Sequence, residues 1–341
     1  MMTIRPRLFM AALVSRPLQS LHPFSAAMQY LRAMTTALFT HFACLDHVTP
    51  PGHPESPERL RAVLQALETP DFAALARAEA PRAEADALAA VHPRHFVKYV
   101  LDSVPERGLR AIDGDTTLSP GSGEAALRAA GAAIAAVDAV MTGEAKTAFA
   151  AVRPPGHHAE PATAMGFCVF NNIAVGALRA RAHGIRRIAV VDFDVHHGNG
   201  TQAAFEADED LFFASTHQWP LYPGTGLPQE RGVANNILNV PLPPRSASDE
   251  FREAVDSLIL PALDAFAPDL VMISAGFDAH VADPLADLRL TEADFAWATA
   301  QLCRIAASHA KGRVVSTLEG GYDLEALAAS AAAHVKALMA A

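Results

Sequence analysis

The sequence predicts an α/β fold, in which a mostly parallel central sheet is flanked by helices. Short apolar runs typical of buried strands recur at 147–152, 188–193, 211–215, 270–274 and 314–318. Segments with helical apolar periodicity lie between these runs. Such an alternation of strands and helices predicts parallel strands with helices packed on both faces of the sheet.

The first predicted strand opens at 34–39, where a run of threonine and apolar residues begins. The helices that we expect next along the chain begin near serine, aspartate or threonine in several cases, as helix N-termini commonly do. The predicted helices cover residues 57–67, 123–141, 171–183, 249–266 and 291–309. Alanine is frequent in these segments and favours helix.

A single catalytic domain is predicted for residues 34–341, because no repeat or low-complexity linker divides the chain. The stretch from Met1 to Leu45 has no acidic residue and contains four arginines, which resembles a targeting segment. A start codon assigned too far upstream explains the same composition. We therefore expect residues 1–33 to be a disordered or mis-annotated extension.

Composition narrows the classes of partner and compartment. The net charge of −10 disfavours a nucleic-acid-binding surface. A membrane span is not predicted, because the sequence contains no run of eighteen uncharged apolar residues. Cys44, Cys168 and Cys303 have neither paired nor CxxC spacing. We therefore expect the protein to act in a reducing compartment, the cytoplasm. We expect no direct nucleic-acid or membrane partner, and the sequence leaves the oligomeric state open.

Polar segments directly follow five of the predicted strands. In open α/β sheets ligands bind at the carboxyl ends of strands, so these segments are expected to meet at one rim. A single active site explains them better than five separate structural features. The segments are 153–158, 192–196, 215–217, 276–278 and 319–322.

The segment after the second of these strands predicts a metal site. Strand alternation sends Asp192, Asp194 and His196 to the same side, so that positions 194 and 196 can hold one cation. Buried carboxylates beside histidines are costly to desolvate unless a cation or full hydrogen bonding compensates them. Aspartate and histidine as ordinary strand-end polar groups are the simpler alternative.

Several motifs in fixed order resemble the zinc-dependent histone deacetylase superfamily, in particular its class II-like bacterial deacetylases and the acetylpolyamine amidohydrolases. The resemblance covers most of residues 37–341 and implies the three-layer α/β fold shared with arginase. The residues that carry it are His53-Pro-Glu-Ser-Pro-Glu-Arg-Leu60, Arg153-Pro-Pro-Gly-His-His158, Gly166-Phe-Cys168, Asn171-Asn172, Asp192-Phe-Asp-Val-His-His-Gly-Asn-Gly200, Tyr222-Pro-Gly-Thr-Gly226, Ser274-Ala-Gly-Phe-Asp278 and Gly320-Gly-Tyr322.

The resemblance implies two metal sites. Asp194, His196 and Asp278 would hold one catalytic Zn²⁺ and leave a coordination position open for water and substrate. An oxygen-rich ligand set also suits iron(II) or cobalt(II). A structural K⁺ would be held by Asp192, by Ser215 and by the backbone carbonyls of Asp194, His196 and Thr216.

Further residues would perform the catalysis by the same resemblance. His158 would be the general base and acid, oriented by Asn199, and His157 would help electrostatically, oriented by Asp192. Asn199 is neutral where other branches carry a carboxylate, so we expect His158 to be held less strongly as a cation. Tyr322 would donate to the developing oxyanion.

A narrow substrate tunnel is also implied. Phe167 and Tyr222 would form its walls, and Tyr222 departs from the family by its hydroxyl. Gly166 would leave space beside the zinc, and Leu285 would stand where polyamine-selective members carry an acidic residue. The loop 49–57 with His53 would frame the mouth, and Asp115 is a weaker candidate for holding the substrate backbone.

These features favour an amidohydrolase that removes acetyl or other acyl groups from lysine side chains of proteins or peptides. An amidohydrolase of acetylpolyamines or other small acylated amines is the close alternative. A binuclear arginase-like enzyme would need additional bridging carboxylates. A protein that binds acyl-lysine without turnover is a hypothesis from a different class.

Overall fold

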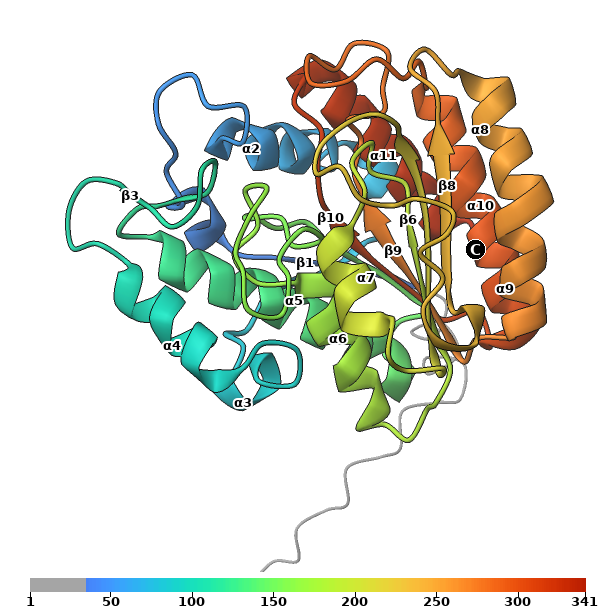
Figure 1. The fold of residues 1–341 in the computed structure, drawn as a ribbon, viewed down its shortest axis with the longest axis horizontal. Helices are drawn as coiled ribbons and strands as arrows, with labels where there is room; N and C mark the ends of the chain where they lie inside the picture. The colour runs from blue at the N-terminus through green and yellow to red at the C-terminus, as the bar shows by residue number, and fades with distance from the viewer. Residues whose placement is uncertain (1–34) are drawn as a thin grey trace, which may run out of the picture.

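The computed structural model describes residues 35–341 and confirms the predicted three-layer α/β architecture (Figure 1). The predicted extension at residues 1–33 lies outside the described part. The middle layer is an eight-stranded sheet in the order β2-β1-β5-β10-β9-β6-β7-β8, in which all neighbours are parallel. Its strands are β1 (Thr36–Thr40), β2 (Ala76–Glu79), β5 (Thr147–Ala150), β6 (Ile188–Asp192), β7 (Leu211–Gln218), β8 (Ile237–Leu242), β9 (Leu270–Ala275) and β10 (Val314–Leu318).

Helices cover both faces of this sheet (Figure 1). One face is covered by α5 (Ser122–Thr142) and α6 (Asn172–Arg181). The other is covered by α2 (Pro57–Ala66), α8 (Ser248–Ala254), α9 (Leu260–Phe266), α10 (Glu292–His309) and α11 (Leu324–Met339). Shorter elements complete the chain: η1 (Phe42–Leu45), η2 (Pro70–Phe72), α3 (Ala85–Leu88), α4 (Arg94–Ser103), β3 (Arg110–Ala111), β4 (Thr117–Leu118), α7 (Asn199–Phe205), η3 (Val233–Asn235) and the π-helical turn η4 (Val255–Ile259).

The five strands predicted to carry polar segments are β5, β10, β9, β6 and β7, which are contiguous in the sheet. Their carboxyl ends therefore meet at one rim, as expected. One expected position is wrong in detail. Residues 215–217 do not follow a strand but lie within it, because β7 continues to Gln218, whose N–H donates to the carbonyl of Val195.

Elements that the sequence reading missed owe their form to neighbours more than to local pattern. The strand β2 is exposed and contains two alanines, an arginine and a glutamate, and it is extended because it pairs with β1. The strand β8 contains Pro241, which cannot donate a backbone hydrogen bond. Such a residue is tolerated here because β8 is an edge strand.

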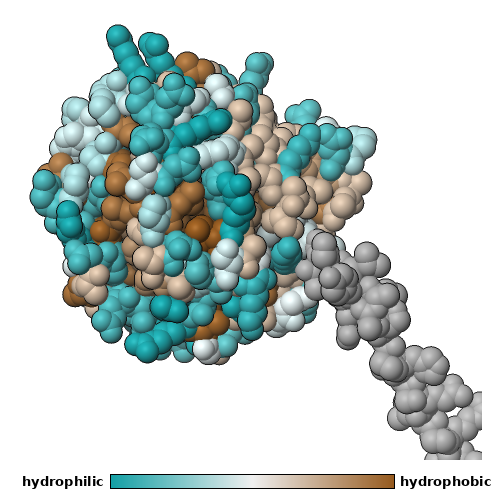
Figure 2. All heavy atoms as spheres, turned by 90° about the vertical axis from the view of Figure 1, so that its right-hand side faces the viewer, coloured by the Kyte–Doolittle hydropathy of each residue, from teal (hydrophilic) through white to brown (hydrophobic). Residues whose placement is uncertain are grey.

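A groove of about 460 Å³ with a mixed apolar and polar lining runs beside this edge strand. Figure 2 shows the corresponding side of the molecule, where apolar side chains gather between polar ones. Leu238 and Val240 of β8 line the groove with Leu258 of η4. Pro241 lies along the same groove and leaves part of the edge unable to pair with a strand of another chain.

Helix α5 is a central packing element. By length and composition it could cross a membrane, but 67% of its apolar window is buried inside the protein, as in the core helix of a globular fold. Gly131 lies in this helix, and a Cβ built there would be 1.9 Å from the carbonyl oxygen of Pro81. The segment 81–83 therefore crosses α5 at a distance that only glycine allows.

The first prediction concerns Gly131. Alanine is the better helix former by about 1 kcal/mol, yet Gly131→Ala should lower the free energy of unfolding by about 1–3 kcal/mol, because the new methyl group must displace backbone. Urea unfolding followed by circular dichroism measures the change. Gly114→Ala is the control, since a Cβ at that position has no neighbour within 4 Å. Equal stability of both variants would contradict the packing argument.

Candidate active site

Asp194, His196 and Asp278 form a buried cluster at the carboxyl ends of β6 and β9, and one ligand atom from each lies within 4.8 Å of the others. His196 Nδ1 is 3.1 Å from Asp194 Oδ1 and 3.1 Å from Asp278 Oδ2. Within residues 35–341 this is the one group of such side chains that could hold a metal ion. The structure thus brings together the three expected zinc ligands.

The electrostatics of this cluster fit a bound cation. Burial, together with the charge of Asp194, raises the pKa of the Asp278 carboxyl to about 7. Although burial opposes it, hydrogen bonds to both carboxylates raise the pKa of His196 to about 10. Two carboxylates that face each other away from water favour a positive charge between them. Oxygen and imidazole ligands in this number suit Zn²⁺.

Backbone groups hold the two carboxylates in place. The N–H of Gly320 donates to Asp194 Oδ2 at 2.8 Å, and the N–H of Val195 donates to Asp278 Oδ1 at 2.8 Å. A Cβ on Gly320 would be 2.1 Å from Asp278 Oδ2. The loop after β10 can therefore approach the metal-binding cluster only because a glycine is there.

The paired histidines after β5 are also buried, and their rings lie 4.0 Å apart. His157 Nδ1 is 2.9 Å from Asp192 Oδ2, and His158 Nδ1 is 2.8 Å from Asn199 Oδ1. The structure therefore contains both of the expected orienting hydrogen bonds. They join the loop after β5 to the end of β6 and the start of α7.

The two histidines differ in pKa. Burial opposes protonation of His157, but the charges of Asp194 and Asp192 raise its pKa well above the ordinary value. Burial lowers the pKa of His158 well below the ordinary value, and the charges of His157 and His196 lower it further. His157 is thus suited to carry a positive charge, and His158 to remain neutral.

Glu160, which the sequence reading did not single out, helps to define the tautomer of His158. It accepts a hydrogen bond of 2.8 Å from Asn199 Nδ2, and this contact turns Asn199 Oδ1 toward His158. Because Oδ1 can only accept, His158 Nδ1 carries the proton. His158 Nε2 is then left with a lone pair, and the ring lines the active-site cavity.

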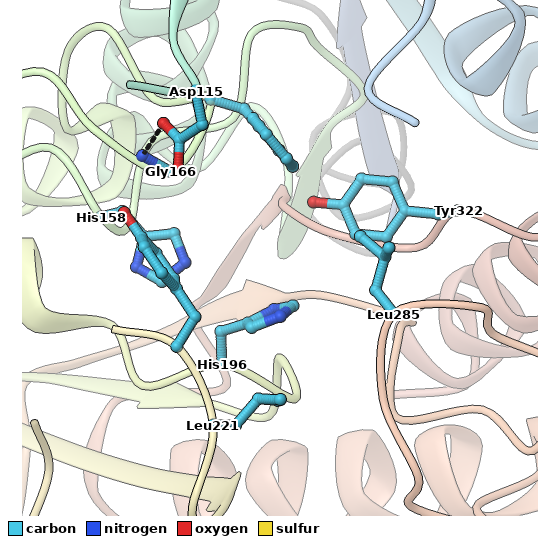
Figure 3. A pocket seen from close by; sticks show the side chains of 9 residues that line it. Asp115, His158, Gly166, His196, Leu221, Leu285 and Tyr322 are labelled. Atoms are coloured by element: carbon cyan, nitrogen blue, oxygen red, sulfur yellow. Dashed lines mark hydrogen bonds between the residues drawn. The ribbon is translucent and has the colours of Figure 1, made fainter. Parts of the chain in front are cut away.

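This cavity has a volume of about 220 Å³, and His196 of the Asp194/His196/Asp278 cluster lines it (Figure 3). The hydroxyl of Tyr322 points into it, on the side opposite His158. All four expected tunnel residues line the cavity, together with residues that include Leu221, which was not foreseen. The full lining is Asp115, His158, Gly166, Phe167, His196, Leu221, Tyr222, Leu285 and Tyr322.

The tunnel walls are held by ring contacts. Phe167 packs edge to face on Tyr322 at 5.9 Å and on His53 at 4.7 Å, which brings the loop 49–57 to the mouth. Tyr222 packs against His158 at 5.1 Å. Gly166 lines the same cavity as His196, and a Cβ there would be 2.4 Å from the ring of His158. Its missing side chain makes room for that ring.

The expected potassium ligands lie side by side across two strands. Asp192 of β6 is in register with Ser215 of β7, and Thr216 follows directly. Asp192 Oδ1 accepts the N–H of Asp194, and Ser215 Oγ is 3.0 Å from His217 Nδ1. None of these contacts tests ion binding, so the K⁺ site stays a prediction.

Asp115, the candidate for substrate backbone binding, lines the cavity and accepts the N–H of Gly166.

A second buried charge network, missed in the sequence, supports the Tyr322 loop. Glu55 accepts hydrogen bonds from both Arg59 and Arg153, and all three side chains are fully buried. The guanidinium of Arg59 also donates to the carbonyl of Gly321 at 2.6 Å and lies 4.8 Å from the centre of the Tyr322 ring. The signal was present, because Glu55 and Arg59 lie in the motif that begins at His53.

Glu319 is a further buried acid that sequence reasoning did not assign. Its Oε2 accepts the backbone N–H groups of Gly156 and His157 at 2.7 and 3.1 Å. Burial raises the pKa of this carboxyl to about 7. Glu319 therefore joins the loop after β10 to the histidine loop after β5.

Fold and site together define an α/β protein whose described residues include one Asp/His/Asp cluster that could hold a metal ion, at the carboxyl end of a parallel sheet. The model of the histone deacetylase domain matches residues 53–338. The chain therefore belongs to the histone deacetylase family, and it is a hydrolase that acts on amide bonds.

Individual relatives agree with this assignment. The chain is 40% identical to histone deacetylase 14, chloroplastic, of Arabidopsis thaliana, over 93% of this chain and 80% of the relative. It is 42% identical to a histone deacetylase-like amidohydrolase of Pseudomonas aeruginosa, over 84% and 82%. The crystal structure of an HDA15 HD domain aligns with a TM-score of 0.86 at 36% identity, covering 90% of this chain and 89% of that chain.

The second prediction concerns Glu55. Glu55→Gln should lower the free energy of unfolding by about 3–5 kcal/mol, because two buried guanidinium groups lose their counter-charge. Burial alone raises the pKa of Glu55, but the Arg153 charge and a hydrogen bond with His47 hold it well below the ordinary value. The carboxylate therefore contributes its full stabilisation above its unfolded pKa of about 4.3, and this contribution is lost progressively as pH falls from that value through the lower pKa of the folded state.

Chemical unfolding at pH 7 measures the first effect, and a pH series that continues downward to about pH 2–3 measures the second. The matched control is Glu58→Gln, because Glu58 pairs with Arg61 on the surface, where both side chains are 55% exposed. That pair should contribute less than about 1 kcal/mol. If Glu55→Gln is as stable as the control at pH 7, the buried network does not stabilise the fold.

Proposed function

We propose that this protein is a zinc-dependent deacylase that removes acetyl or another acyl group from lysine side chains of proteins or peptides. The observation that carries the proposal is the joint presence, around one cavity, of the Asp194/His196/Asp278 cluster, neutral His158 and the hydroxyl of Tyr322. Each is a component that amide hydrolysis requires. A zinc ion held by the cluster would activate water and polarise the acyl carbonyl.

His158 is suited to exchange protons with the reacting atoms. Its Nε2 lone pair accepts the proton of the attacking water, and the same nitrogen then donates it to the leaving amine. The low pKa of His158, which arises from burial and from the neighbouring charges, keeps it unprotonated before reaction. Asn199 keeps the proton of His158 on Nδ1 and so leaves Nε2 available.

Tyr322 supplies the second element of the mechanism. Burial raises the pKa of its phenol well above the ordinary value, although Arg59 opposes the shift, so the hydroxyl keeps its proton. A protonated hydroxyl in this cavity donates a hydrogen bond to the oxyanion that forms on the acyl carbonyl. Arg59 holds the backbone of the preceding glycine and thereby fixes the approach of the ring.

The cavity walls favour an extended aliphatic substrate. Phe167, Tyr222 and Leu285 offer ring faces and a branched alkyl side chain to the methylene groups of an acyl-lysine. Leu285 offers no charge to a second ammonium group, which disfavours acetylpolyamines. Asp115 lines the cavity beside Tyr222, and its carboxylate is the candidate acceptor for a substrate backbone N–H. We further propose that K⁺ binds beside Asp192 and that the protein acts in a reducing compartment.

The third prediction tests the proposed function itself. Purified protein should hydrolyse acetyl-lysine peptides when loaded with zinc and lose activity in a chelator, with recovery on metal addition. Longer acyl-lysine peptides and acetylpolyamines complete the panel, compared by kcat/KM. A higher kcat/KM for acetylpolyamines would reject the lysine substrate. Zinc-loaded protein that binds these peptides without turnover would reject the enzyme mechanism.

The fourth prediction concerns Tyr322. Tyr322→Phe should lower kcat about 100-fold, because one donor to the oxyanion is lost while the ring keeps its packing. Zinc content by mass spectrometry and the melting temperature should be unchanged. Tyr99→Phe, on the exposed surface of α4, is the control and should have wild-type kcat. Undiminished kcat in Tyr322→Phe is the result that contradicts the role.

A further inference from the structure

Asp283 is a buried acid outside the metal cluster that connects two loops of the active site. It lies in the loop after β9 and is 7% exposed. Its Oδ1 accepts the N–H of Leu285 at 3.0 Å, and its Oδ2 accepts the N–H of Tyr322 at 2.7 Å and that of Asp323 at 3.4 Å. One carboxylate therefore binds the tunnel wall and the oxyanion donor at their backbones.

The first of these contacts shapes the tunnel wall. A hydrogen bond from the residue two positions on to an aspartate side chain closes a tight Asx turn, and Pro284 fits its middle position. The backbone of the turn is anchored from the other side, because Asp283 N–H donates to the carbonyl of His280 at 2.9 Å. The position of Leu285 at the cavity thus depends on the side chain of Asp283.

The second contact completes the support of the Tyr322 loop. Between the end of β10 at Leu318 and the start of α11 at Leu324, the chain has no regular structure. Arg59 donates to the carbonyls of Glu319 and Gly321 in this loop. Arg59 therefore satisfies carbonyl groups, while Asp283 satisfies N–H groups. The two side chains hold complementary halves of the same short backbone segment.

We propose that Asp283 is a positioning residue that sets the Tyr322 hydroxyl and the Leu285 side chain relative to each other. This inference rests on the proposed function, and Asp283 itself is not among the residues that line the cavity. Donors to an oxyanion act only within about 3 Å of it, and a displacement near 1 Å can cost about 100-fold in rate. Loss of Asp283 should therefore reduce kcat through Tyr322.

Asp283→Asn is the most conservative test. Asparagine keeps the shape but has one acceptor oxygen, so its NH₂ group must face N–H donors of one of the two loops. We expect kcat to fall about 10- to 100-fold relative to the wild-type enzyme. KM should stay within about threefold of the wild-type value, and the zinc content should be unchanged. Asp287→Asn is the matched control on the same loop, because within residues 35–341 the Asp287 side chain has no hydrogen bond or ion pair.

A double-mutant cycle separates positioning from general damage. If Asp283 acts through Tyr322, adding Asp283→Asn to Tyr322→Phe should lower kcat less than about threefold further, since the hydroxyl that needed positioning is already gone. A full additional loss, equal to that of the single variant, would overturn the proposal. An Asp283→Asn enzyme with wild-type kcat would overturn it as well.

Hydrogen exchange gives a readout that needs no turnover. In the zinc-loaded Asp283→Asn protein, amides of both the 283–289 and the 320–324 segments should exchange faster, with other segments unchanged. Continued protection of the Tyr322 amide would overturn the proposed link between the loops. If the wild-type protein hydrolyses no acyl substrate, the proposed function fails, and the exchange experiment still decides whether Asp283 holds both loops.

Discussion

The structure depends on one constraint, which is that several carboxylates are buried together at the carboxyl rim of the sheet. Asp192, Asp194, Asp278 and Glu319 are each at most 1% exposed. Isolated charges of this kind would be too costly to desolvate. The rim therefore concentrates compensating groups: the imidazoles of His157 and His196, several backbone N–H donors, and a cluster whose geometry suits a cation. The glycines at the rim follow from the same constraint, because the carboxylates must touch backbone.

The second buried network shows how stability and chemistry are connected in this fold. Glu55 directly precedes the N-cap of α2, far in sequence from the Tyr322 loop, and Arg59 bridges the two. A buried ion pair contributes little net stability by comparison with apolar packing, but removing one partner is costly. Such a network is useful where a loop without regular structure must be held in one position. The loop after β10 is of this kind, and hydrogen bonds from Arg59 and to Asp283 hold its carbonyl and N–H groups.

The parts that could be predicted from the sequence are those encoded in short contiguous patterns. The five apolar runs became the central strands, and the polar segments after them supplied the cluster at Asp194 and the histidine pair. By contrast, β2 is extended because it pairs with β1, and the strand propensity of its own residues does not predict it. The same holds at the site. Glu160, Glu319 and Asp283 each accept a hydrogen bond from a residue 39 or more positions away in sequence, and a charged residue in a loop gives no sign of which distant N–H it will meet.

The difference between the two adjacent histidines illustrates what the surroundings add to a motif. By residue type alone His157 and His158 are equivalent, but the fold gives one a carboxylate partner and the other a neutral amide, the two partners that the family resemblance implied. A carboxylate stabilises the imidazolium of His157, and that positive charge in turn lowers the pKa of His158. The neutral partner Asn199 then does nothing to restore basicity through charge, while Glu160 keeps it in the orientation that frees His158 Nε2. A carboxylate at position 199 would raise the pKa of His158 by stabilising its imidazolium. The neutral amide of Asn199 and the buried carboxylate of Asp192 therefore act together: both keep His158 neutral and able to accept a proton.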